Sequence, residues 1–171
     1  EESYFLGSIV LIKGETSPEA DVIDGQQRLT TLTILLCLLR DRAVDVKMRD
    51  SIQKRIAADG DELAGSQPHP RLTLRYRDNW VLRDYFQHPS ETRTPETLQQ
   101  VDRLTDAQQN LRDNAAYLGQ RLDQWGADDI RDFARFVAAR CCLVVVTTRD
   151  QRSAYRIFSV LNDRGMDLSP T

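Results

Sequence analysis

The chain has 171 residues, which is enough for one ordinary domain or two very small ones, and its 40% apolar and 29% charged residues are typical of a globular protein. Its formal net charge of -3 argues against a freestanding duplex-binding protein, because such proteins rely on an excess of positive charge. No apolar run approaches the roughly 20 residues that span a bilayer, so we expect no membrane contact.

The cysteines and histidines argue against a zinc site. The three cysteines, Cys37, Cys141 and Cys142, form no Cys-x-x-Cys pair, and we expect the two histidines, His69 and His88, at the surface beside prolines. Cysteines in leucine-rich or valine-rich runs are usually small buried hydrophobes in a reducing compartment. The sequence therefore predicts free, buried thiols in a cytoplasmic protein.

The first elements are a predicted hairpin and a buried helix. Residues 4–12 and 21–23 are rich in β-branched and aromatic side chains and flank turn-forming residues, which predicts two paired strands. Residues 28–39 are apolar on nearly every side and too numerous for a strand, which predicts a central helix. Asp24 is expected to cap this helix, with Gln27 reaching back in a capping box.

The middle of the chain carries weaker signals. Alternating charges over residues 40–62 predict an exposed helix followed by a loop, and residues 71–75 alternate like a half-buried strand. Residues 78–86 predict a short helix. Apolar residues recur three and four apart over residues 98–125, with only Gln108 interrupting them, which predicts one long amphipathic helix.

The last third completes an α+β pattern. A short helix around residues 130–137 leads into a strand at 141–148, whose Leu-Val-Val-Val centre predicts burial. Asp150 is expected to cap a final helix that ends at residues 162–165 and turns one apolar stripe inward. No regular βαβ repeat is present, so we expect a single, mostly helical α+β domain with a small β-sheet.

The turn Asp24-Gly25-Gln26-Gln27-Arg28 is the most informative local feature. It joins a strand to a helix N-terminus, whose unpaired N–H groups attract an anion, and Arg28 adds a bidentate phosphate donor. Asp24 is a candidate ligand for a phosphate-bound divalent cation. In the alternative interpretation Asp24 only caps the helix, the two glutamines are solvated and Arg28 pairs with an acidic surface residue. The Gly-Lys-Ser/Thr element of a P-loop is missing.

A second polar turn lies at the end of the final helix. Asn162, Arg164 and Gly165 follow an apolar-faced helix, where Gly165 is suited to the left-handed conformation that ends it. This turn is either a helix stop or one wall of a pocket. Because the final helix must share a core with the helix at 28–39, we expect Asn162 and Arg164 to lie on the same face as Arg28.

Three segments together resemble the N-terminal domain of GmrSD-type restriction endonucleases. They are the strand at residues 4–11, the run Val-Ile-Asp-Gly-Gln-Gln-Arg-Leu-Thr-Thr-Leu at 22–32, and residues 154–169, which contain Phe-Ser-Val-Leu-Asn-Asp-Arg-Gly-Met-Asp-Leu-Ser. The resemblance implies a ParB/sulfiredoxin-like core with a helical elaboration. It also implies a nucleoside triphosphate-binding, and possibly hydrolysing, regulatory domain of a bacterial phage-defence protein that restricts modified DNA.

The resemblance assigns roles to both turns. Asp24 and Arg28 would contribute to hydrolysis, and Asp24 would hold the divalent ion that accompanies the nucleotide. The nucleotide-binding residues would be Gly25, Gln26, Gln27, Arg28, Asn162, Arg164 and Gly165. Neither the nucleotide base nor the ion follows from these residues.

Two departures from the family pattern bear on activity. Members have an upstream Gln-Arg-x-Tyr-x-Trp-like segment and a downstream acidic residue with its helix, so we expect residues 1–171 to be a partial domain that is weak or inactive alone. A nuclease domain of the same or a partner chain would cut the DNA, and modified DNA would be reached only through the full-length protein. The alternative function is a noncatalytic interaction or dimerisation module that docks a nuclease through the helix at 98–125.

Overall fold

A computed structural model describes residues 3–61, 63, 65–88 and 103–165, with only the backbone described at 162–165. The chain divides into two compact units, residues 1–28 with 139–171 and residues 29–138. In the described part no helix is both long and apolar enough to cross a membrane. The architecture confirms the predicted α+β class, with helices predominating over a small sheet.

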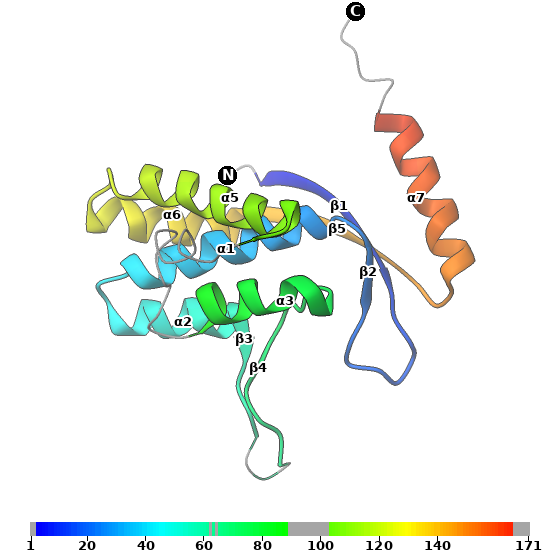
Figure 1. Ribbon diagram of the computed structural model, residues 1–171, viewed down its shortest axis with the longest axis horizontal. Coiled ribbons are helices and arrows are strands. Elements are labelled where there is room, and N and C mark those ends of the chain that lie inside the picture. Colours follow the sequence, from blue (N-terminus) through cyan, green and yellow to red (C-terminus); the bar gives the residue numbers. More distant parts are fainter. Residues whose placement is uncertain (1–2, 62, 64, 89–102, 166–171) are drawn as a thin grey trace, which may run out of the picture. The chain divides into compact units, whose positions relative to one another are not determined.

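The first unit contains a three-stranded sheet in the order β2-β1-β5 (Figure 1). Strand β1 (Tyr4–Ile12) pairs antiparallel with β2 (Asp21–Asp24), which confirms the predicted hairpin. It pairs in parallel with β5 (Cys141–Thr148), so strands from the first and last thirds of the chain share one sheet. The central strand β1 is the one that buries side chains most fully, at Ile9 and Val10.

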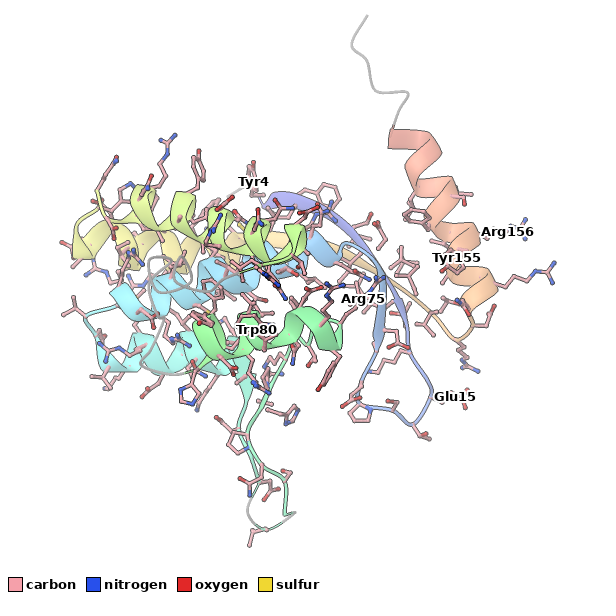
Figure 2. The ribbon with its side chains drawn as sticks, in the orientation of Figure 1. Tyr4, Glu15, Arg75, Trp80, Tyr155 and Arg156 are labelled. Atoms are coloured by element: carbon pink, nitrogen blue, oxygen red, sulfur yellow. The ribbon has the colours of Figure 1, made fainter. Side chains whose placement is uncertain are left out.

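Helix α7 (Gln151–Gly165) packs against all three strands of this sheet (Figure 1). The Asp150 carboxylate accepts a hydrogen bond from the Ser153 N–H at 2.8 Å, which confirms the predicted cap. Ala154 is fully buried, and the rest of the predicted stripe is half-buried. On the opposite side of the helix, Arg156 extends into solvent (Figure 2).

Strand β5 is half-exposed, so the prediction of a buried strand is wrong. Val144 and Val145 are 52% and 54% exposed, because β5 is an edge strand with β1 as its one neighbour in the sheet. The predicted burial of the cysteines fails here too: Cys141 is half-buried and Cys142 is exposed. Apolar composition indicates a strand, but it does not say whether a second strand or layer covers it.

The second unit is a helical bundle with a small hairpin. Its elements are α1 from Leu29 onward, α2 (Val46–Ile56), α3 (Tyr76–Leu82), the π-helix η1 (Arg83–Gln87), α5 (Asp106–Leu122), α6 (Ala127–Arg140) as far as Ala138, and strands β3 (Ala57–Ala58) and β4 (His69–Pro70). Figure 1 shows the hairpin loop extending away from α2 and α3. The buried core of this unit includes Ile34, Cys37, Leu39, Phe86 and Leu122, which confirms the predicted burial of Cys37 and of the helix that carries it.

Arg40 is buried in this bundle, although the charge pattern from residue 40 onward predicted exposure. Its side chain is 1% exposed and donates hydrogen bonds to the Gln53 Oε1 at 2.8 Å, the Phe86 carbonyl at 2.9 Å and the Gln87 carbonyl at 3.2 Å. The last two acceptors lie at the end of the π-helix, where carbonyls lack helical donors. The Arg40 Nε also donates to the Asp41 carboxylate at 2.7 Å. A buried arginine is stable here because these acceptors satisfy its donors and the carboxylate balances its charge.

Two further predictions in this unit are corrected. Residues 71–75 form no strand, because side chains satisfy their backbone: Leu74 N–H donates to the Asn79 Oδ1 and Gln87 donates to the Leu72 carbonyl. The predicted helix at 98–125 is shorter, since Thr105 caps α5 and Gln108 completes a capping box. Residues 98 and 101 of its predicted stripe lie outside the described residues.

Candidate functional site

The site begins where β2 turns into α1 (Gln26–Arg42). Asp24 still pairs with Val10 as the last residue of β2, and Gly25 alone separates it from the helix. The predicted capping box from Asp24 to Gln27 is therefore wrong, because the sheet retains Asp24. Gly25 has φ +88°, and a Cβ there would collide with the Ile9 side chain, so this turn requires glycine.

Arg28 reaches from the first turn of α1 back to strand β1. Its Nη1 donates a hydrogen bond to the Ser8 carbonyl oxygen, and its guanidinium lies against Gly7. A Cβ at Gly7 would be 2.9 Å from the Arg28 Cζ and 2.9 Å from Nη2, closer than real side chains approach. The absence of a side chain at Gly7 therefore provides the space for this guanidinium.

A bulge in β1 brings Gly7 into this position. Phe5 pairs with Cys142 and Ser8 pairs with Val144, so two residues of β1 face a single residue of β5. Gly7 takes φ +106° within this bulge, a conformation that side chains disfavour. The bulge therefore directs both the Gly7 backbone and the Ser8 carbonyl to the start of α1.

Arg28 is not neutralised within the described part of the chain. There, the Ser8 carbonyl is its hydrogen-bond partner, and no carboxylate lies within ion-pair distance of its guanidinium. The alternative interpretation, in which Arg28 pairs with an acidic residue, finds no support among those residues. The half-buried cation lies beside the N-terminus of a 17-residue helix, whose partial charge is also positive. Both features attract an anion.

The other residues of the turn differ in their surroundings. Gln26 is exposed and its Nε2 donates to the Val22 carbonyl at 2.8 Å, so this amide supports the turn, while Gln27 is exposed. Asp24 is half-buried, and its carboxylate makes no hydrogen bond to other described residues. No cluster of three histidine, cysteine, aspartate or glutamate side chains with the geometry of a metal site is found in the described segments.

The second predicted turn belongs to the same compact unit as Arg28. Helix α7 continues through Asn162 and Arg164 to Gly165. The side chains at 162–165 lie outside the described residues, so their convergence with Arg28 stays a prediction. His69 and His88 are exposed, as expected from their positions beside prolines.

Sequence reasoning missed Gly7 and Ser8 as parts of the site. The β-branched and aromatic residues at 4–12 predict a strand and give no role to the glycine within that run. A glycine inside a strand pattern indicates a bulge or a close backbone approach, and both occur at Gly7. That signal shows that something approaches Gly7, but the sequence does not say that it is Arg28.

Comparison with known proteins supports the resemblance carried by these segments. The family model of the GmrSD restriction endonuclease N-terminal domain matches residues 1–171. The chain belongs to this family. This membership supports a role for the chain in a restriction and phage-defence protein. A search of curated proteins finds no match, and neither does a search of solved structures.

Proposed function

We propose that this GmrSD N-terminal domain binds a nucleoside triphosphate at the turn from Asp24 to Arg28 and regulates DNA restriction by doing so. In this proposal the phosphates lie at the N-terminus of α1 and contact its backbone N–H groups. The Arg28 guanidinium supplies a fixed cationic contact. The nuclease activity belongs to another domain, in the same chain or in a partner, and modified DNA is met only by the complete protein.

The position of Arg28 is the observation that carries the proposal. A half-buried guanidinium without an ion-pair partner among the described residues lies at a helix N-terminus, which is itself positive. Two positive groups side by side are unfavourable unless an anion joins them, so such an arrangement supports a ligand site. Phosphate fits because a guanidinium offers planar, paired N–H donors to its oxygens.

The donor set suits a metal ion that arrives with the nucleotide. Asp24 offers one carboxylate, and Mg²⁺ bound to phosphates commonly takes only one or two protein carboxylates and keeps several waters. The ion would neutralise charge on the phosphates. Asp24 would hold that ion or orient a water, and Arg28 would stabilise negative charge that develops during hydrolysis. We propose hydrolysis as a weaker activity than binding, because turnover needs a more completely positioned site.

Equilibrium titration with each nucleoside triphosphate, with and without Mg²⁺, tests this function. The expected result is saturable binding of at least one nucleotide that weakens when its β- and γ-phosphates are removed. The Asp24→Asn variant should lose the Mg²⁺ dependence while it stays folded. Binding that tracks the base and ignores the phosphates would contradict a phosphate site at this turn.

Exposed apolar side chains favour a second candidate function, a noncatalytic interaction or dimerisation module. Val144 and Val145 on edge strand β5 and Val160 on α7 are each at least half exposed. Exposed apolar residues at a sheet edge are typical of surfaces that pair with other chains. Analytical ultracentrifugation separates the two candidates: a concentration-dependent dimer that binds no nucleotide supports this module, and a nucleotide-binding monomer supports the first function.

A further inference from the structure

We infer that the Gly7-Ser8 bulge is a positioning element that fixes the Arg28 guanidinium before a ligand arrives. The inference rests on the proposed phosphate site and adds to it a part of β1 outside the Asp24–Arg28 turn. Gly7 provides the space and Ser8 the acceptor. Neither residue needs to touch the nucleotide, because both act through Arg28.

The Ser8 carbonyl holds one end of the Arg28 side chain. It accepts a hydrogen bond from the Arg28 Nη1, which pins one end of a side chain that otherwise has several rotatable bonds. The acceptor is a main-chain atom in the central strand of the sheet, and Ser8 pairs with Val144 of β5. An arginine held in this way loses less conformational entropy when it binds an anion.

The edge of the guanidinium formed by Nε and Nη2 is separate from the Nη1 group that Ser8 holds. With Nη1 occupied by Ser8, the Nε and Nη2 groups form a pair of donors that have no hydrogen-bond partner among the described residues. This pair has the spacing that binds two oxygens of one phosphate. The bulge therefore fixes the side chain by one nitrogen and leaves two for the ligand.

Gly7 has no side chain at the position where the guanidinium lies. A Cβ there would lie 2.9 Å from Nη2 and 3.2 Å from Nε, at the two groups left for the ligand. Those atoms belong to the end of a flexible side chain, so the guanidinium would move away from the added methyl group, and the positive φ of Gly7 would add backbone strain. Gly7→Ala is thus expected to displace Arg28 from the Ser8 carbonyl.

A matched variant separates the collision at Gly7 from the general effect of replacing a glycine at positive φ. Gly65 has φ +67°, and a Cβ there meets nothing within 4 Å, so Gly65→Ala adds a methyl group without a collision. Gly65→Ala should behave as the wild type in the measurements below. The larger backbone strain of alanine at φ +106° is separated from the effect through Arg28 by the double-mutant cycle.

The first measurement needs no nucleotide. Rotation about the Nε–Cζ bond exchanges Nη1 with Nη2, and a hydrogen bond at Nη1 slows that rotation, so nitrogen-15 NMR of the ligand-free protein should show separate Arg28 Nη signals. They should remain in Gly65→Ala and merge in Gly7→Ala. Merged Arg28 signals in the wild type would overturn the inference, whatever the protein binds.

The second measurement is a double-mutant cycle on nucleotide affinity. Gly7→Ala should weaken binding about tenfold, which corresponds to losing a well-oriented contact. It should have no further effect in the Arg28→Ala background, because Gly7 acts through Arg28. Equal weakening in both backgrounds would overturn the positioning role and leave Gly7 a purely structural glycine. Separate Nη signals in a wild type that binds no nucleotide would instead refute the proposed function, and the positioning role with it.

Discussion

The guanidinium of Arg28 occupies the space that a side chain at Gly7 would need, 2.9 Å from the position of its Cβ. This relationship links the start of helix α1 to a bulge in the central strand of the sheet. It explains why the turn after β2 has an arginine with a fixed position. In our proposal, the phosphate site at this turn therefore depends on residues of β1 as well.

Arg40 is expected to be the most important charged residue for stability. Arg40→Met keeps much of the side-chain volume but leaves the carbonyls of Phe86 and Gln87 without their donor. We expect the free energy of unfolding to fall by about 3 kcal/mol or more, as is usual when one partner of a buried polar group is removed. Urea unfolding measures this, and Arg135→Ala, on an exposed helix face, should change little. A loss as small in Arg40→Met as in Arg135→Ala would contradict a structural role for the buried arginine.

The capping box of α5 is expected to contribute modestly to the free energy of unfolding. Thr105→Ala removes the acceptor of the Gln108 N–H, at 3.3 Å, and the hydrogen bond to the Asp78 carboxylate. The expected loss of unfolding free energy is about 1 kcal/mol, typical of helix N-caps. Thr73→Ala, at an exposed position outside helices and strands, is the matched control and should have no measurable effect. If both variants unfold at the same urea concentration as the wild type, α5 does not depend on its cap.

Stability at alkaline pH is expected to depend on Cys37. Burial raises the pKa of the Cys37 thiol from its ordinary value of 9.0 to about 12. The unfolded chain loses this proton at lower pH than the folded protein, so the free energy of unfolding should fall as pH rises from about 9 toward 12. Cys37→Ala should make that fall shallower in urea unfolding at pH 8 to 10. Parallel pH dependences of the two proteins would contradict burial of the thiol.

The elements that the sequence predicted well are those with strong local signals. The β1–β2 hairpin, the Asp150 cap and the Cys37 helix follow from turn residues, a cap and an apolar run, all of which are local. Burial of Arg40 and exposure of Val145 were missed. Both depend on what packs against the residue from elsewhere in the chain.

The candidate site also combines a local feature that the sequence indicates with a tertiary contact that it does not. The turn around Gly25 could be predicted because its residues are consecutive. The contact between Arg28 and Gly7 could not, because it depends on the register shift in the pairing of β1 with β5. Sequence indicates which residues suit a phosphate, and only the tertiary structure shows what holds them.

The central claim, that Arg28 binds nucleotide phosphates, is tested most directly by comparing nucleoside triphosphate affinity in wild type, Arg28→Ala and Arg156→Ala by calorimetric titration. Arg156 lies on α7 in the same compact unit and extends into solvent, so its removal controls for the loss of one positive charge (Figure 2). Losing a charge-assisted hydrogen bond should weaken binding roughly ten- to hundredfold in Arg28→Ala. Arg156→Ala should bind as the wild type does. Equal affinity of wild type and Arg28→Ala, with both proteins folded by circular dichroism, would contradict the claim.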